Sequence, residues 1–435
     1  MRNVTIDVKH VTRVEGHGNI AVRVRDGEIT SLQLQIVESP RFFEAFMRGR
    51  PYAEAPHIAC RICGICSVGH TTAAVKAMEA ACGIVPSEQT VKLRKLLFYG
   101  EQIQSHVLHV LFLAVPDYLG VGSVIPLAGS HPETVKTALR LKRLANDLCA
   151  AVGGRHIHPI AAHVGGFTHV PRAAELIELR QRLVAARADL EAVAALYAKL
   201  PIPDFERDTE YVALQVVGNG EYAFYDGDIV STRDPRPTPV RDYRSRVIEE
   251  VVQHSAAKHC RSPNAPSYAV GALARFNNNH ARLHPAAAQL AAALGLSAPC
   301  RNPFHNNTAQ LVEIVHCVEC AVEGIDELLV RGMKLEPLEE PARFGPGAGA
   351  AEVPRGVLFH EYGVDSQGRI ESANLIIPTG QNLANIEDDM RAYVPRMLDD
   401  GLSREEMTLR LEMLVRAYDP CISCATHLLD VEWIE

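Results

Sequence analysis

Two cysteine pairs near opposite ends of the chain constrain the fold more than any other feature. The segment "RICGIC" contains Cys63 and Cys66, and the segment "DPCISC" contains Cys421 and Cys424. A Cys-X-X-Cys turn directs two sulfurs toward one ion, and two such turns can complete a four-sulfur shell. If the pairs share a site, the fold must bring both ends of this 435-residue chain together.

The distance between the pairs bears on the kind of metal site. Structural zinc modules usually close within tens of residues, because the ion ties down a small unit. Here the metal would instead join the two ends of a large body. The spacing therefore favours a redox or catalytic metal, while a structural zinc site and no metal at all remain open alternatives.

The other cysteines do not extend this pattern. Cys60 lies three residues before Cys63 but has no counterpart in the downstream pair. Cys317 and Cys320 fall within a helical pattern, where positions i and i+3 share one apolar face, so core packing explains them better than metal binding. The chain has 11 cysteines, an odd number, and no secretion signal, which argues against a disulfide scaffold.

Composition excludes several classes of protein. Hydrophobic residues make up 47% and charged residues 22%, which is the normal globular range. The formal net charge of −8 gives no reason to expect nucleic acid as a partner. The most apolar long stretch, 106–129, is interrupted by His109, Pro116 and Asp117, so a buried helix and loop suit it better than a membrane span.

The patterning predicts one large, predominantly helical α+β unit over residues 1–435. Residues 1–50 form an N-terminal β region with a turn at Asp26-Gly27, and Ser87 starts a long helix. Residues 335–355 are rich in Pro, Gly and Ala and are expected to form a long loop. The remaining expectations are a helical body over 87–332 with helices at 133–151, 172–199, 282–294 and 306–332; a hairpin insert near 205–235 turning at Asn219-Gly220; a hairpin at 355–380; a C-terminal metal-binding segment at 381–427; and a helix at 403–416.

Five segments in order resemble the large subunit of nickel–iron hydrogenases. "RICGIC" followed by His70, and "DPCISCATH", are similar to the two signature motifs of that family. "VTRVEGHG", "ESPRFFEAFMRGR" and "EVPRGVLFHEY" also resemble family segments. The stretches around "LRKLLFYGEQIQSHVLHVLFLAVPD" and "RNPFHNNTAQLVEIVH" look most like the soluble, multi-subunit, cofactor-coupled branch.

The resemblance implies a role for each cysteine of the two pairs. Cys63 and Cys421 would be terminal nickel ligands, and Cys66 and Cys424 would bridge nickel to iron. The family's iron also carries carbon monoxide and cyanide, and its chemistry is the reversible heterolytic splitting of dihydrogen. The residues agree with this, because soft thiolates favour nickel and iron over hard cations.

Further site residues follow from the same resemblance. Arg355 and Thr379 match residues that hydrogen-bond cyanide, and His70 matches a histidine that supports Cys66. Glu15 matches the carboxylate that accepts the first proton. Considered without the resemblance, Glu15 is an ordinary turn residue, Arg355 a surface charge beside a loop, and His70 a core histidine.

A second ion is implied near the C-terminus. Glu44 and His427 match the side-chain ligands of a magnesium or similar divalent ion. Only "LLDVEWIE" follows His427, whereas many relatives carry a longer tail that a protease removes after nickel insertion. We expect this tail to be removed on maturation as well.

The resemblance also implies partners and a location. An iron–sulfur small subunit would take up the electrons, further electron-transfer subunits would pass them on, and a maturation protease and nickel-insertion proteins would act on the chain. A cytoplasmic location is expected. Two alternatives use the same residues differently: a structural or assembly protein with a four-cysteine zinc site, and a quinone-site subunit of the complex I type, whose family lacks the four cysteines.

Overall fold

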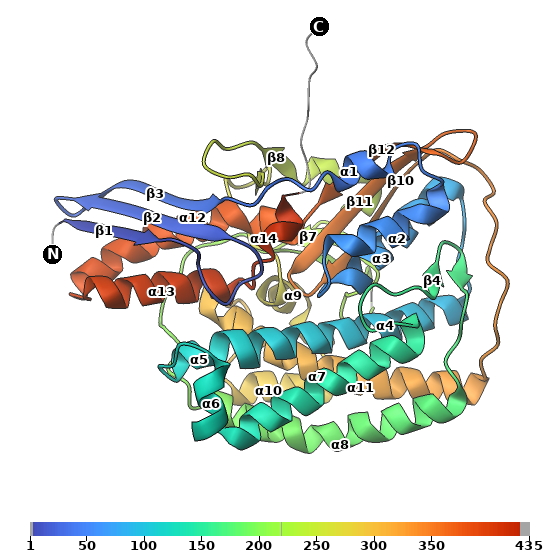
Figure 1. The fold of residues 1–435 in the computed structure, drawn as a ribbon, viewed down its shortest axis with the longest axis horizontal. Coiled ribbons are helices and arrows are strands. Elements are labelled where there is room, and N and C mark those ends of the chain that lie inside the picture. The colour runs from blue at the N-terminus through green and yellow to red at the C-terminus, as the bar shows by residue number, and fades with distance from the viewer. Residues whose placement is uncertain (1–2, 219, 427–435) are drawn as a thin grey trace, which may run out of the picture.

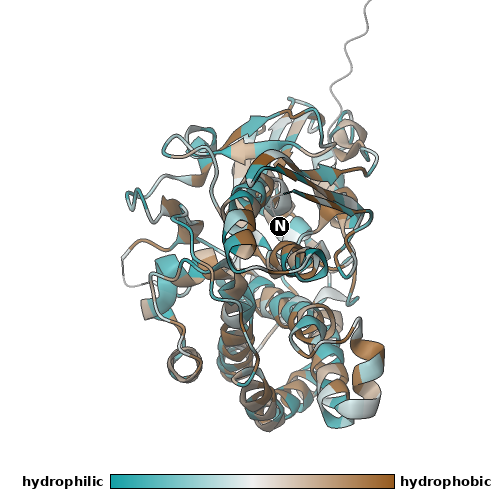
Figure 2. Ribbon diagram, turned by 90° about the vertical axis from the view of Figure 1, so that its left-hand side faces the viewer, coloured by the Kyte–Doolittle hydropathy of each residue, from teal (hydrophilic) through white to brown (hydrophobic). Residues whose placement is uncertain are grey.

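The computed structural model describes residues 3–218 and 220–426, and it separates into a helical layer and an upper layer of sheets and helices (Figure 1). The long helices α4, α7, α8 and α11 pack together in the lower layer, and two three-stranded sheets lie in the upper layer. Hydrophobic and hydrophilic residues are mixed along the helices of the lower layer, as amphipathic helices require (Figure 2). The fold is thus α+β and mostly helical, as predicted.

Helices account for about half of the described residues. None of them combines the length and apolar character that a bilayer span requires within residues 3–218 and 220–426. The helices are α1 Phe43–Met47, α2 Ala55–Ala59, α3 Ser67–Cys82, α4 Glu88–Val107, α5 Val115–Tyr118, α6 Val124–Ser130, α7 Pro132–Gly153, α8 Ala173–Tyr197, α9 Ala272–Asn279, α10 Pro285–Ala293, α11 Asn306–Arg331, α12 Pro378–Asp399, α13 Arg404–Ala417 and α14 Ile422–Ala425, with a π-helical turn at Leu108–Ala114 and 3-10 turns at Tyr52–Glu54, Cys60–Ile62, Val240–Ser245, His280–Arg282 and Pro303–His305.

The strands form small antiparallel sheets. Sheet β1-β2-β3 belongs to the N-terminal region, and sheet β10-β11-β12 lies against α3. Three two-stranded ladders, β4-β5, β6-β7 and β8-β9, complete the set among the described residues. The strands are β1 Val4–Val8, β2 Gly18–Arg25, β3 Glu28–Ile36, β4 Ala162–His163, β5 Gly166–Phe167, β6 Val212–Gln215, β7 Asp228–Ser231, β8 Ile248–Glu250, β9 His259–Arg261, β10 Pro346–Val353, β11 Gly356–Val364 and β12 Ile370–Ile376.

Local signals in the sequence placed several elements correctly. Asp26 and Gly27 both have positive φ (52° and 88°) and join β2 to β3, as a two-residue hairpin turn of this type requires. Ser87 caps α4, because its side chain accepts a hydrogen bond from the Thr90 N–H at 3.1 Å. The expected helices near 133–151, 172–199, 306–332 and 403–416 correspond to α7, α8, α11 and α13.

The predicted long loop over 335–355 is wrong in its second half, which forms strand β10. Its small residues permit the strand to lie directly against α3. A Cβ atom added at Gly347 would meet Ala81 N at 2.2 Å, and one at Gly349 would meet Ala77 N at 2.4 Å. Glycine and alanine, which suggest a loop by composition, are needed here for close packing.

One further expectation needs correction, and two helices were not predicted. The ladder β6-β7 ends at the pair Gln215 and Asp228, so a longer connection joins these strands and a tight turn at Asn219-Gly220 does not; Asn219 itself lies outside the described residues. Helices α3 and α12 were also missed. Almost every residue of α3 is buried, so it lacks the polar face that marks an amphipathic helix.

Candidate metal centre

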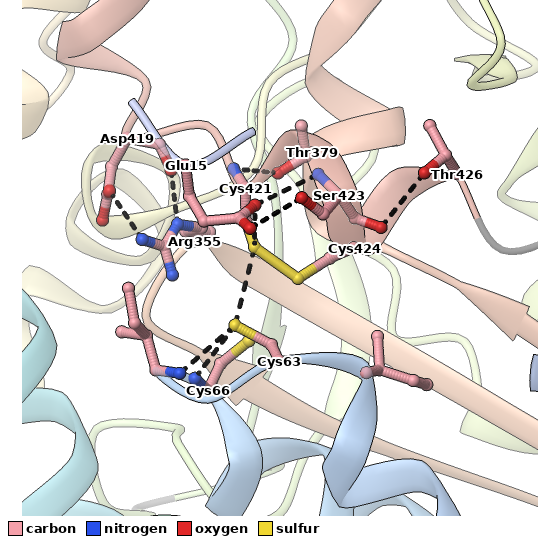
Figure 3. The surroundings of a disulfide bond; sticks show 12 residues. Glu15, Cys63, Cys66, Arg355, Thr379, Asp419, Cys421, Ser423, Cys424 and Thr426 are labelled. Carbon is pink, nitrogen blue, oxygen red and sulfur yellow. Dashed lines mark hydrogen bonds and ion pairs between the residues drawn. A yellow bond between two sulfur atoms is a disulfide. The ribbon is translucent and has the colours of Figure 1, made fainter. Parts of the chain in front are cut away.

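The four paired cysteines meet at one point inside the molecule (Figure 3). Cys63 and Cys66 lie between a 3-10 turn and α3, while Cys421 and Cys424 lie at α14. All four are buried, and their sulfurs lie within 4.8 Å of one another. Cys63 Sγ is 3.6 Å from Cys421 Sγ, so the sulfurs of the two pairs are close enough to share a ligand.

Backbone contacts between the chain ends create this meeting point. Glu15 forms a parallel bridge with Cys421, and the Ile422 N–H donates to Glu15 O at 2.8 Å. Gly16 (φ 86°) makes the approach possible, since a Cβ atom there would meet Ser423 N at 2.8 Å. Arg41 donates both to Ile62 O and to Ser423 O, and so links the two cysteine segments directly.

The two sulfurs of the downstream pair lie in direct contact. A disulfide joins Cys421 to Cys424, whereas Cys63 and Cys66 are free thiols. Metal coordination uses the thiolate form of all four cysteines. A buried four-sulfur set has the donor chemistry for zinc, iron or nickel, and it does not suit magnesium or calcium.

The pKa values of the two upstream thiols are shifted in opposite directions. A hydrogen bond from Cys66, helped by the Arg355 charge, lowers the pKa of Cys63 to about 7 against the effect of burial. Backbone N–H groups of Ile65 and Cys66 also point at Cys63 Sγ, at 3.3 and 3.4 Å. The same pairing with Cys63, together with burial, raises the pKa of Cys66 well above its usual value. Cys63 is therefore the first of the two to become a thiolate.

Arg355 lies at the tip of the β10-β11 hairpin, beside the cysteines (Figure 3). Its Nε and Nη2 donate to the backbone oxygen and carboxylate of Asp419, at 2.5 and 2.9 Å. Its Nη1 is buried and has no hydrogen-bond partner. Burial alone would lower the pKa of Arg355, but Asp419 and the two thiols raise it, so the guanidinium stays charged. The site thus contains one free, fixed cationic donor.

Glu15 and Thr379 both contact Cys421. Cys421 Sγ lies 3.1 Å from Glu15 Oε2, and the Ser423 hydroxyl donates to Glu15 Oε1 at 2.7 Å. Thr379 Oγ1, in the first turn of α12, accepts the Cys421 N–H at 2.9 Å. The structure therefore brings both residues to the sulfur cluster, as the sequence predicts.

His70 and Glu44 lie in the surrounding layer. His70 Nδ1 is 3.3 Å from His360 Nε2, and His360 Nδ1 is 2.8 Å from the Tyr362 hydroxyl. Glu44 is buried on α1 and accepts the Leu375 N–H at 2.7 Å. The other predicted ligand of the divalent ion, His427, lies outside the described residues.

Sequence reasoning missed two polar residues of the site. Asp419, which orients Arg355, has φ 50° and lies two residues before Cys421. Glu101 on α4 accepts the N–H groups of Val68 and Gly69 at 2.6 and 2.8 Å, and burial raises its pKa well above the usual range. The acidic residue inside "YDPCISC" was a visible signal for the first, but no local signal marked the second.

The remaining cysteines do not join the cluster. Cys60 Sγ contacts His57 O at 3.2 Å, and Cys317 is fully buried on α11. Cys320 Sγ lies 3.5 Å from His316 Nε2 on the same helix. The four-sulfur group of the described residues thus consists of the two Cys-X-X-Cys pairs.

A buried four-thiol centre joining both chain ends defines a metalloprotein, and comparisons identify the class. The family model described as nickel-dependent hydrogenase matches residues 41–138 and 260–427, and a HoxL-like model matches residues 5–39. The chain belongs to the nickel-dependent hydrogenase family, as a large subunit of the nickel–iron type.

Similar proteins cover nearly the whole chain. The alpha subunit of sulfhydrogenase 1 from Pyrococcus furiosus is 36% identical, over 98% of each chain. The F420-non-reducing hydrogenase of Methanothermobacter marburgensis has a matching subunit that is 33% identical, over 98% of this chain and 95% of that one. The solved structure of an NAD⁺-reducing NiFe hydrogenase in the H2-reduced state superposes with a TM-score of 0.88 at 30% identity, covering 98% of this chain and 100% of that one.

Proposed function

We propose that the four thiolates hold a nickel–iron centre whose iron carries carbon monoxide and cyanide. When bound, this centre supplies the reversible heterolytic splitting of dihydrogen into protons and electrons. Cys63 and Cys421 would be the terminal nickel ligands, with Cys66 and Cys424 bridging to iron. The supporting observation is the convergence of four buried sulfurs within 4.8 Å, next to a charged arginine with a free donor.

Arg355 and Thr379 are proposed to bind the polar ends of the iron's diatomic ligands. The free Nη1 of Arg355 is a charged donor held in place by Asp419. Thr379 uses its oxygen to accept the Cys421 N–H, which leaves its hydroxyl proton available to donate. Both donors are fixed before any ligand arrives, so little reorganisation is needed.

Glu15 is proposed to take the proton that leaves the site. Its Oε2 lies 3.1 Å from Cys421 Sγ, which is within proton-transfer reach. Ser423 donates to the other carboxylate oxygen and keeps the group oriented. We expect Glu15→Gln to stop proton exchange with solvent while nickel stays bound. Hydrogen–deuterium exchange activity measures this, and an unchanged exchange rate would rule out the assignment.

A divalent ion, of which magnesium is the first choice, is proposed at Glu44 and His427. Glu44 supports this as a buried carboxylate, a hard oxygen ligand. We further propose that the residues after His427 are removed once nickel is in place. The intact mass of nickel-loaded protein tests this, because a retained tail contradicts it.

The electrons must pass to another polypeptide, for which we propose an iron–sulfur small subunit followed by further electron-transfer subunits. The names of similar proteins include sulfhydrogenase, F420-non-reducing and NAD-reducing hydrogenases, which are multi-subunit by their own subunit labels. A maturation protease and nickel-insertion proteins complete the proposed partners. We also propose that the enzyme works in the cytoplasm, as a member of this cofactor-coupled branch.

Infrared spectroscopy of the enzyme purified with its partner tests the centre. We expect carbon monoxide and cyanide stretches together with one nickel per chain, and we expect Cys63→Ser to lose nickel and hydrogenase activity. Cys60→Ser is the matched control, because Cys60 is a buried cysteine three positions away whose contact to His57 O a serine can keep. Zinc without nickel in the wild type would support a structural zinc site instead.

A further inference from the structure

A second group of metal-ligating side chains lies apart from the cysteines. His254 lies in the loop between β8 and β9, His259 begins β9, and Glu387 lies on α12. One ligand atom from each lies within 4.8 Å of the other two. Among the described residues this is the one convergent His, Cys, Asp or Glu group besides the four cysteines.

His259 supplies the observation that points to a ligand. Only 7% of the residue's surface is exposed, and its Nε2 is buried with no hydrogen-bond partner. Buried polar atoms are almost always paired in folded proteins, so an unpaired ring nitrogen inside a group of ligands needs an explanation. A bound cation would supply the missing partner.

The donor atoms of the three residues lie at distances that bracket the spacing of zinc ligands. His254 Nε2 lies 2.7 Å from Glu387 Oε1, and the two histidine rings meet edge to face with centroids 5.5 Å apart. Donor atoms around a tetrahedral zinc ion lie about 3.4 Å apart, given metal–ligand bonds of about 2.0–2.1 Å. That spacing falls between the 2.7 Å contact and the 4.8 Å limit of the group.

We propose that His254, His259 and Glu387 bind one divalent first-row transition ion, with Zn²⁺ as the expected occupant. Two imidazole nitrogens and one carboxylate form a ligand set that such ions prefer. His254 is 21% exposed at its side chain, so water can reach the group and complete the coordination shell. Burial lowers the pKa of His259, which keeps this ring in the neutral form that ligates.

The ion would join the β8-β9 loop and β9 to α12, and hydrogen bonds connect both sides of this junction to β3. Glu387 Oε1 also accepts the Leu34 N–H of β3 at 2.8 Å, and the Ala256 N–H donates to Ile36 O at 3.0 Å. The loop between β8 and β9 is thereby held against both β3 and α12. Because α12 also carries Thr379 at its start, the ion would stabilise the helix that contacts the sulfur cluster without touching the cluster itself.

Zinc counting on the purified enzyme tests the proposal. The enzyme is equilibrated with Zn²⁺, dialysed, and analysed for zinc, nickel and thermal stability. We expect one zinc per wild-type chain, and at least about 100-fold weaker zinc binding in His259→Asn and in Glu387→Gln. Gln at 387 keeps an acceptor for the Leu34 N–H, so the helix contact survives. Zinc should raise the melting temperature of the wild type but not of the variants.

Three controls separate this site from other zinc binding. His17→Asn removes an exposed histidine paired with Glu38 at 2.6 Å and should leave the zinc count unchanged. Zinc-edge X-ray absorption of the wild type should show nitrogen and oxygen neighbours only, because zinc in the cysteine centre would show sulfur at about 2.3 Å. Cys63→Ser should keep this zinc even though it loses nickel. Three results would each overturn the proposal: a zinc content of His259→Asn and Glu387→Gln equal to that of the wild type, no zinc in the wild type, or sulfur neighbours around the zinc.

Discussion

Two arginines, Arg275 and Arg355, are both buried beside carboxylates, yet only one of them has a donor to spare. Arg275 Nε and Nη2 bind both oxygens of Glu313, at 2.7 and 2.6 Å, and Nη1 reaches Glu352 at 3.1 Å. Its remaining N–H groups donate to Val353 O and Pro354 O. Every N–H of Arg275 therefore has a partner within the protein.

Arg355 differs because its Nη1 is buried without a partner while Asp419 holds the other nitrogens. The two residues are linked, since Arg275 binds the carbonyls of the two residues that precede Arg355 in the hairpin. Arg275, whose N–H groups all have hydrogen-bond partners, thus positions Arg355, which has a donor without one. A buried charge with all donors paired stabilises the fold, whereas one with a free donor marks a place where a ligand is expected.

The largest effect, on unfolding free energy, should come from removing Arg275. Arg275→Met leaves Glu313 and Glu352 as buried carboxylates without their cation, which should cost about 3–5 kcal/mol of unfolding free energy. Urea unfolding measures it. Arg187→Met is the control, because Arg187 makes a similar two-pronged contact to Glu319 at a half-exposed position and should cost about 0–1 kcal/mol. Similar losses in both variants would contradict the contrast.

Removing the unpaired Nη1 donor of Arg355 should affect activity more than stability. Arg355→Lys keeps the charge but cannot both hold Asp419 and present a fixed second donor. We expect hydrogenase activity to fall by about 10²–10³-fold with nickel retained. Arg94→Lys, at a buried arginine bound to Glu79, should lower stability and leave the activity per nickel nearly unchanged. Full activity in Arg355→Lys would show that the free donor has no role.

The buried cluster of Arg275, Glu313 and Glu352 should also make the unfolding free energy depend on pH. Burial raises the pKa of Glu352 to about 7, against the opposing effect of Arg275. Between about pH 4.5 and 7 the folded protein then binds a proton that the unfolded chain has lost, so unfolding free energy falls as pH rises. Relative to Glu352→Gln, the wild type should lose up to about 1.4 kcal/mol per pH unit in that window. A pH-independent difference in urea midpoint between the two proteins would refute this.

The smallest effect concerns the cysteines outside the metal centre. Cys317 is fully buried on α11 and takes no part in the sulfur cluster. We expect Cys317→Ala to cost about 1 kcal/mol of stability through the small cavity it leaves. Its nickel content and activity should match the wild type. A loss of metal in this variant would show that the third cysteine pair belongs to the site.

Local chemistry explains which parts of the fold could be predicted. The Asp26-Gly27 turn and the Ser87 cap depend on neighbours in sequence, so their residue types reveal them. Strand β10 was not predicted, because its glycines are required by the close packing of α3 and not by a turn. The same holds for Glu101 and Asp419, whose partners are set by packing. No local pattern shows which buried donor meets which acceptor.

The sequence by itself predicted the ligand set, because Cys63, Cys66, Cys421 and Cys424 form the two Cys-X-X-Cys pairs that lie in motifs typical of this family. It also indicated that both chain ends must meet. The tertiary structure decided what surrounds the sulfurs: the bridge from Glu15 to Cys421, the free donor of Arg355, and the separate group at Glu387. The physical reason is that spacing along the chain sets which ligands a turn presents, while burial and the partners left unpaired are set by residues that meet only on folding.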